Sequence, residues 1–193
     1  MHEPTCTICK QTNKGSYTFN PVTFTYTCDD CNESNAMNSI NWNDPTANVS
    51  PHFTVREALL LPRWNLLHNP TDKEKEAIRR MADKMEEIRA VLGLPISVHC
   101  WIRPTKVNAP DSPHHGKDYN AFVGGTKGSM HIKGLAADFH VLGYGGSVQC
   151  HAMRVRLVPH LESLGIRLED KYGPWLHVDL RTVPAGGKRF FKP

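Results

Sequence analysis

The sequence predicts a mixed α and β fold in which a small cysteine-rich module precedes one larger domain. Three observations support this prediction: two Cys-x-x-Cys pairs near the start, one long amphipathic helical pattern, and three stretches with strand-like alternation. A chain of 193 residues has the length of one domain, or of one domain with a small module. We place the module at 1–35, a linker rich in Asn, Ser and Asp at 36–51, and the larger domain at 52–193.

The N-terminal module carries four cysteines with the spacing of a zinc site. Two pairs, each of the form Cys-x-x-Cys, are separated by 18 residues; they are Cys6, Cys9, Cys28 and Cys31. The segment 16–27 between them is β-branched and aromatic, with a break at Asn20-Pro21, and predicts a hairpin. Together these features predict a zinc ribbon, because a structural Zn²⁺ supplies folding energy that so short a segment lacks. Its role, a recognition module or a structural staple, stays open.

Helices are predicted in three places in the larger domain. Two capping boxes, Thr54-x-x-Glu57 and Thr71-x-x-Glu74, start a short helix through Leu61 and a long one that ends at Gly93. The apolar residues of the long helix fall on one face; they are Ile78, Met81, Met85, Ile88 and Leu92. A third helix is expected over 147–157, with the helical region ending near Gly165.

Strands are predicted at 96–103, 135–141 and 175–181, where apolar and polar residues alternate. The segment 104–130 is expected to be a long functional loop, and the Gly-rich basic tail after Pro184 to be loose. In the second strand Leu135, Ala137, Phe139 and Val141 form the core face, which turns Asp138 to the opposite side. By the same alternation Arg103, His177 and Asp179 lie on open faces of the first and third strands.

Two histidines and a carboxylate on these strands form a candidate metal site. His131 precedes Asp138 by seven residues, and Gly134 lets the backbone turn so that both side chains reach one point. With His177 they would supply three ligands and leave one position open for water, as in a catalytic zinc site. In a chain with 11 histidines, the pairing of His131 with Asp138 alone is open between a ligand pair and two incidental polar residues.

The motif Ser129-x-His131-x-x-Gly134-x-Ala136-x-Asp138, followed by Trp175-x-His177-Val-Asp179, resembles the M15 family of zinc peptidases. That family includes D-Ala-D-Ala carboxypeptidases and L-alanyl-D-glutamate endolysins, and the resemblance spans about residues 52–183. It implies an α+β fold, in which a small antiparallel sheet with flanking helices carries the zinc. It also implies cleavage of peptidoglycan stem peptides by a zinc-activated water.

The resemblance also assigns roles to individual residues. It implies that His131, Asp138 and His177 are zinc ligands and that Arg103 and Ser129 contact the substrate. We add Trp175, on the face of His177, as a third substrate contact. Arg103 could also stabilise the oxyanion.

The residue that takes the proton from water is less evident. Many members of the family have a carboxylate three residues before the last histidine, where this chain has Pro174. We expect Asp179 to serve instead, with Asp170 and Glu169 as rivals. The missing carboxylate also leaves an alternative, a non-catalytic zinc-containing binding domain of the same fold, as in hedgehog signalling proteins.

Composition limits the partners. The net charge of +4 is mild, no basic run resembles a nucleic-acid arm, and no run of about 18 apolar residues could span a membrane. The resemblance implies peptidoglycan as the partner, and we expect the chain to be a monomer. A zinc ribbon that binds nucleic acid is a weaker alternative. The N-terminus lacks the basic start and apolar stretch of a signal peptide. We expect a phage endolysin or wall-remodelling enzyme that stays in the cytoplasm until it is released.

Overall fold

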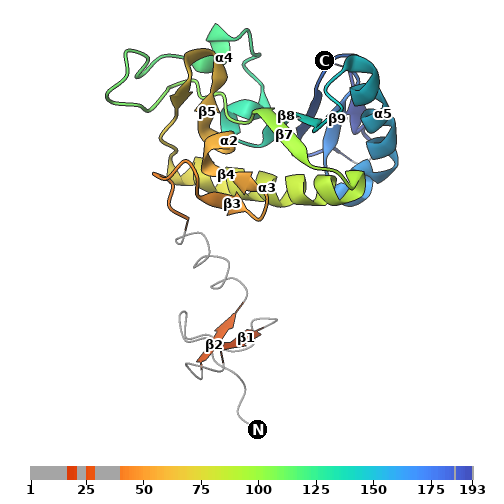
Figure 1. Ribbon diagram of the computed structural model, residues 1–193, viewed down its shortest axis with the longest axis horizontal. Coiled ribbons are helices and arrows are strands. Elements are labelled where there is room, and N and C mark those ends of the chain that lie inside the picture. Colours follow the sequence, from red (N-terminus) through yellow and green to blue (C-terminus); the bar gives the residue numbers. More distant parts are fainter. Residues whose placement is uncertain (1–16, 21–24, 29–39, 185, 193) are drawn as a thin grey trace. The chain divides into compact units, whose positions relative to one another are not determined.

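The computed structural model describes residues 17–20, 25–28, 40–184 and 186–192. The chain divides into two compact units, Met1–Asn41 and Trp42–Pro193, each of which is considered by itself (Figure 1).

A β-hairpin is the described part of the first unit. Strands β1 (Tyr17–Asn20) and β2 (Thr25–Cys28) are antiparallel, with Tyr17 opposite Cys28. This hairpin agrees with the one predicted between the cysteine pairs. Cys6, Cys9 and Cys31 lie outside the described residues, and only the backbone of Cys28 is described. The zinc ribbon therefore stays a prediction.

A five-stranded sheet forms the centre of the second unit. Its strand order is β11-β9-β10-β8-β7, and every neighbouring pair is antiparallel except β9 with β11, which is parallel. The bounds are β7 (Ile96–Cys100), β8 (Ala136–Val141), β9 (Arg167–Glu169), β10 (Leu176–Asp179) and β11 (Phe190–Phe191). The predicted strands 96–103, 135–141 and 175–181 thus exist as β7, β8 and β10, each somewhat shorter.

One face of this sheet and the long helix build the core. The predicted core face of β8 is buried at Ala137, Phe139 and Val141, and so are Leu176 and Val178 of β10. Helix α3 (Asp72–Leu92) packs against α5 (Ser147–Leu157) and α6 (Leu161–Leu164), and α5 also contacts β8 (Figure 1). The opposite face of the sheet carries Asp138 and His177, and Ala136 and Asp138 on that face are also buried.

The helix starts and the end of the long helix follow the predicted signals. The short helix ends at Leu59, two residues before the predicted Leu61, because Leu60 and Leu61 form a strand. Thr54 starts α2 (Val55–Leu59) and Thr71 starts α3, each with both hydrogen bonds of a capping box. Gly93 ends α3 with φ of 64°, a left-handed conformation that glycine adopts without steric cost. The third predicted helix is α5, which continues through η3 (Val158–His160) and α6 to Gly165.

Short elements connect these parts. They are β3 (Asn48–Ser50), β4 (Phe53–Thr54), β5 (Leu60–Leu61), η1 (Pro62–Trp64), β6 (Leu66–Leu67), α4 (Tyr119–Phe122) and η2 (Met130–Lys133). Strand β3 lies within the expected linker and packs on α3, where Ser50 Oγ donates to Glu86 Oε1 at 2.8 Å. The end of that segment is therefore part of the second unit.

The glycines and charges of the C-terminal tail predict a loose segment, but the structure shows an ordered one. Phe190 and Phe191 form β11, which pairs with β9 at the edge of the sheet. The guanidinium of Arg167 also lies 4.0 Å from the ring centre of Phe191, a cation–π contact. This contact and the strand pairing together hold the tail in place. No helix in the described part of the chain is both long and apolar enough to cross a membrane.

Candidate metal centre

Two turns and two strands bring the three predicted ligands together. Ser129 caps η2, with its Oγ accepting from the His131 amide at 3.3 Å, and Gly134 ends that short helix with φ of 73°. The chain then enters β8, which carries Asp138. On the neighbouring strand β10, His177 lies directly opposite Asp138 in the antiparallel register.

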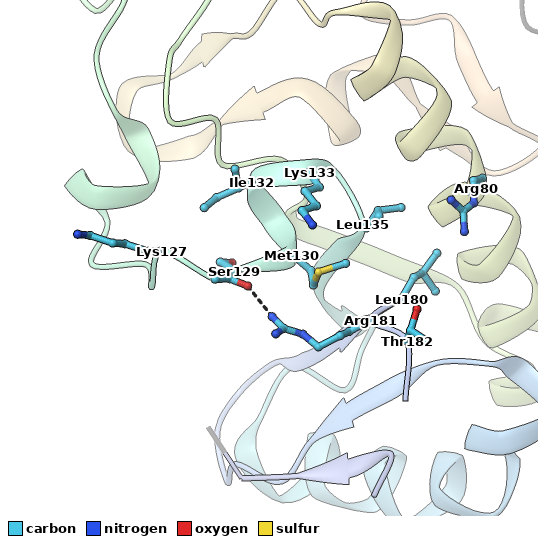
Figure 2. Close-up of a pocket in the computed structure, with 11 residues that line it drawn as sticks. Arg80, Lys127, Ser129, Met130, Ile132, Lys133, Leu135, Leu180, Arg181 and Thr182 are labelled. Atoms are coloured by element: carbon cyan, nitrogen blue, oxygen red, sulfur yellow. Dashed lines mark hydrogen bonds between the residues drawn. The ribbon is translucent and has the colours of Figure 1, made fainter. Parts of the chain in front are cut away.

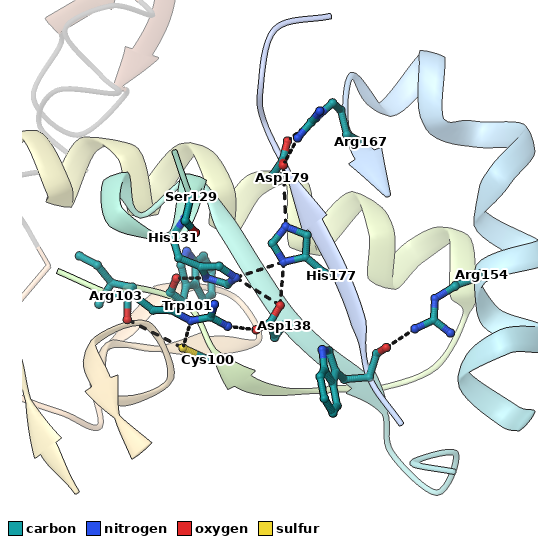
Figure 3. Close-up of polar contacts among 12 residues, drawn as sticks. Cys100, Trp101, Arg103, Ser129, His131, Asp138, Arg154, Arg167, His177 and Asp179 are labelled. Carbon is teal, nitrogen blue, oxygen red and sulfur yellow. Dashed lines mark hydrogen bonds and ion pairs between the residues drawn. The ribbon is translucent and has the colours of Figure 1, made fainter. Parts of the chain in front are cut away.

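The ligand atoms of these three side chains converge on one point of the open sheet face. Asp138 Oδ1 lies 2.7 Å from His177 Nδ1 and 3.2 Å from His131 Nε2, and the two imidazole nitrogens are 3.1 Å apart (Figure 3). One ligand atom from each residue lies within 4.8 Å of the others, so the group can hold a metal ion. Two imidazoles and a carboxylate are a donor set that suits Zn²⁺.

His131 has the tautomer that a metal ligand needs. Its Nδ1 lies 2.6 Å from the carbonyl oxygen of Trp101, which can only accept, so Nδ1 carries the proton. The lone pair on Nε2 consequently faces Asp138 and His177. Burial lowers the pKa of His131, which favours this neutral form over the imidazolium.

His177 is held between two carboxylates. Its Nδ1 faces Asp138, while its Nε2 lies 3.8 Å from Asp179 Oδ2. Burial opposes protonation of this ring, but the interactions with Asp138 and Asp179 outweigh it and raise the pKa of His177 to about 9. A histidine whose second nitrogen faces a carboxylate is the usual arrangement behind a metal ligand.

Asp138 is fixed through its second oxygen. Arg103 Nη2 donates to Asp138 Oδ2, while Arg103 Nε donates to Cys100 Sγ at 3.3 Å. Burial favours the protonated acid, but His131, His177 and Arg103 together hold the pKa of Asp138 far below its ordinary value. Arg103 thus lies beside the site as predicted from the alternation, with Asp138 as its partner.

Asp179 occupies a different position from the one expected of a proton acceptor. Arg167 Nε and Nη2 bind its two oxygens at 2.8 and 2.6 Å, and the Arg181 amide donates to Oδ1 at 2.9 Å. Burial would raise the pKa of Asp179, but these donors and His177 hold it well below its ordinary value. A buried carboxylate paired in this way orients His177 and is poorly suited to take up a proton.

The two rival carboxylates follow each other at the end of β9. Asp170 is exposed, and its backbone amide donates to the Phe191 carbonyl. Glu169 is half-buried, and continuing the register of Val178 with Leu168 places it opposite His177. Its charge acts on His177, which agrees with that placement. Of the three candidates, Glu169 is therefore the one that lies beside the ligands and, among the described residues, forms no ion pair with an arginine.

The remaining predicted site residues lie around this centre. Ser129 is half-buried at the start of η2, and Trp175 is 38% exposed just before β10. Arg154 Nη2 on α5 donates to the Trp175 carbonyl (Figure 3). Lys171 Nζ lies 6.0 Å from the centre of the Trp175 ring.

Sequence reasoning missed the residues that support the ligands. Arg167 escaped notice because β9 has only three residues, too few for a visible alternation. The Trp101 carbonyl carries no signal, since every residue has one. Arg154 lies on a helix whose other residues gave no indication of a buried cation.

The fold and the site together define a class, a mixed α and β domain with a buried His-Asp-His centre on the open face of its sheet. A family model described as Peptidase M15 matches residues 51–179, more than half of the chain, and the chain belongs to this family. The match covers all three ligand candidates and supports peptidase activity. Searches of the curated proteins and of the solved structures found no match.

Proposed function

We propose that this protein is a zinc-dependent peptidase that cleaves the stem peptides of peptidoglycan. The observation that carries the proposal is the preformed ligand set, in which His131, Asp138 and His177 converge. His131 and Asp138 are each hydrogen-bonded to another group through their remaining polar atom, and His177 Nε2 lies 3.8 Å from Asp179. Membership of the M15 family supports both the zinc and the substrate class. A zinc ion held by these residues would supply Lewis-acid activation of water and of the substrate carbonyl.

Glu169 is our candidate for the general base. Proton transfer from the attacking water to the leaving amine needs a carboxylate that is near the ligands and free to accept. Glu169 meets both conditions, because it neighbours His177 across the β9–β10 pair and no ion pair engages it among the described residues. It would compensate for the proline at position 174. Asp170 is the second candidate, and Asp179 we assign to positioning His177.

Arg103, Ser129 and Trp175 are proposed to contact the substrate. Arg103 uses Nη2 and Nε within the protein, which leaves Nη1 to donate to a substrate carboxylate or to a developing oxyanion. Its side chain is 20% exposed, enough for such contact. The partly exposed Trp175 ring offers an apolar wall next to His177.

A peptidase of this kind that accumulates inside the cell and acts after release would be an endolysin. We propose this role for the chain, as a monomer acting on the cell wall. The alternative, a non-catalytic zinc-containing domain of the same fold, is favoured by Pro174 and disfavoured by the position of Glu169.

Digestion of purified peptidoglycan separates the two functions. We expect new amino groups to appear with the zinc-loaded protein, and to be lost on chelation and in His131→Ala. His160→Ala, which removes an exposed histidine distant in sequence from the ligands, is the matched control and should retain activity. Mass spectrometry of the released muropeptides would identify the bond. If zinc-replete wild-type protein released nothing, the peptidase proposal would be wrong.

A further inference from the structure

A pocket that borders the proposed substrate contact Ser129 lies between η2, α3 and the segment that follows β10. It has a volume of about 540 Å³ and is lined by Arg80, Lys127, Gly128, Ser129, Met130, Ile132, Lys133, Leu135, Leu180, Arg181 and Thr182. None of the three ligand candidates lines it. Leu135 and Leu180, joined by a backbone hydrogen bond of 3.0 Å, belong to the core-face alternation, whereas Asp138 and His177 lie on the other face.

The charges around this pocket are all of one sign. Four of its lining residues are exposed cations, Arg80, Lys127, Lys133 and Arg181, and among the described residues that line it none is acidic. Arg181 Nη2 donates to the Gly128 carbonyl, which satisfies one donor without neutralising the charge. Within the described ranges, Arg80, Lys127 and Lys133 form no ion pair. Cations gathered around a hollow raise the local positive potential and favour an anion there.

The other lining groups indicate what kind of anion fits. Hydroxyls of Ser129 and Thr182 offer hydrogen bonds, and Met130, Leu135 and Leu180 form an apolar surface between the cations (Figure 2). Lys133 and Arg80 lie on one side of that surface, and Arg181 and Thr182 on the other (Figure 2). A ligand that suits this pocket carries two or more negative charges separated by short apolar segments.

We propose that this pocket binds phosphate groups of a phosphodiester-linked cell-wall polymer and so holds the enzyme on the wall. The choice of wall polymer rests on the proposed peptidase function; the preference for phosphate rests on the pocket. Four cations exceed what one carboxylate needs, and guanidinium forks match phosphate oxygens in geometry as well as charge. A polymer with one charge per repeat could engage Arg80 and Arg181 on opposite sides at once.

The test compares walls that differ only in phosphate. Binding of the full-length protein is measured on purified walls and on the same walls after hydrofluoric acid has removed their phosphodiester polymers. We expect wild-type affinity to fall by at least about tenfold on the stripped walls, a change of about 1.4 kcal/mol. The double variant Arg80→Gln/Lys133→Gln should bind both kinds of wall as weakly as wild type binds stripped walls.

The matched control removes the same charge elsewhere. Lys106→Gln/Arg156→Gln loses two exposed cations outside the pocket and should bind like wild type. All variants should cleave a soluble stem peptide equally, because none of the four positions belongs to the metal centre. The NMR chemical shifts of the Gly128 and Thr182 amides should change when glycerol 3-phosphate is added. They should not change when the dicarboxylate glutarate is added at the same concentration.

Other results would overturn the proposal. Equal binding of wild type to intact and stripped walls excludes phosphate, as does an equal response to glutarate. An equal loss of wall affinity in both double variants would mean that only the net charge of the protein matters. Tighter binding to anionic phospholipid vesicles than to walls would indicate a membrane ligand instead. Absence of peptidase activity would overturn the proposed function but leave the glycerol 3-phosphate result standing on its own.

Discussion

The three ligand side chains each divide their polar atoms between the centre and the surrounding protein. His131 Nδ1 donates to the Trp101 carbonyl, and Asp138 Oδ2 accepts from Arg103. His177 Nε2 faces Asp179. These contacts orient the side chains and fix the tautomer of His131 before any ion arrives, so little side-chain entropy remains to be lost on binding. The same geometry places a protonated His177 against Asp138. His177 must lose this proton before it can bind a cation through Nδ1.

Zinc binding should therefore release a proton from His177. Its pKa is raised to about 9, so the ring is protonated at pH 7 and gives up that proton to become a ligand. Zinc affinity is expected to rise about tenfold per pH unit between pH 6 and 8 and to level off above pH 9. Calorimetric titration in two buffers with different ionisation enthalpies measures the number of protons released, which should be about one at pH 7.

Release of no proton at pH 7 would contradict this assignment of charge to His177. Asp179→Asn provides a second check, because it removes one of the three carboxylates that raise the pKa of His177. The pH at which affinity levels off should then move downward.

The roles of Glu169 and Asp179 predict different defects. Glu169→Gln removes the proposed base and should lower kcat on a stem peptide by about 10²- to 10⁴-fold while zinc content stays at the wild-type level. Asp179→Asn should instead weaken zinc binding by about 10- to 100-fold, because the partner of His177 is lost. Steady-state kinetics at saturating zinc, with metal analysis of each protein, separates the two.

Asp170→Asn is the control for Glu169→Gln, since it removes a neighbouring but exposed carboxylate. It should retain wild-type kcat. A large loss in Asp170→Asn with little effect of Glu169→Gln would exchange their roles.

At the scale of elements, the turn between η2 and β8 sets the distance between His131 and Asp138. Gly134 occupies this turn with φ of 73°, and its carbonyl accepts a hydrogen bond from Trp101 Nε1 at 3.1 Å. A Cβ at this position would lie 3.1 Å from Ile78 Cγ1 on α3. Both the backbone conformation and the close approach to α3 therefore require glycine.

Gly134→Ala should destabilise the second unit more than the same change at Gly165. Both glycines are left-handed, with φ of 73° and 66°, but nothing lies within 4 Å of a Cβ at Gly165. We expect about 1–2 kcal/mol for Gly165→Ala from the backbone alone and about 2–4 kcal/mol for Gly134→Ala, where overpacking adds to it. Urea unfolding followed by tryptophan fluorescence measures the difference, because Trp42, Trp64, Trp101 and Trp175 all belong to this unit.

Equal losses in the free energy of unfolding for the two variants would mean that α3 shifts to make room for the added methyl group. The contact with Ile78 would then be unimportant. Zinc affinity gives an independent measure, since a shifted turn should weaken it only in Gly134→Ala.

The sequence made some elements predictable and left others hidden, for physical reasons. Alternation over β8 and β10 predicts that Asp138 and His177 share a face because the other face of those strands carries only apolar residues, such as Phe139 and Val178. Strands β9 and β11, of three and two residues, are too short to show a period and form through pairing with distant segments. For that reason the sequence predicts a loose tail where the structure has β11, and it gives no sign that Arg167 pairs with Asp179.

At the scale of the whole molecule, we expect the two units to depend on metal to different degrees. The second unit has a buried apolar core, built on α3 and one face of the sheet, that can sustain its fold without an ion. The first unit, Met1–Asn41, is of a size at which a structural metal is usually needed. The four cysteines predicted to bind zinc all belong to that first unit.

The full chain should therefore bind two zinc ions, and each should be removable without the other. Cys9→Ser is expected to lower the content from two to one and to leave cleavage of a soluble stem peptide intact, because the ligands His131, Asp138 and His177 all lie in the second unit. His131→Ala should also leave one ion but abolish cleavage, and the double variant should bind none. Metal analysis by mass spectrometry, with activity measured on the same samples, checks all four proteins. A wild-type content of one ion that Cys9→Ser does not change would remove zinc from the N-terminal unit and leave its fold to another cause.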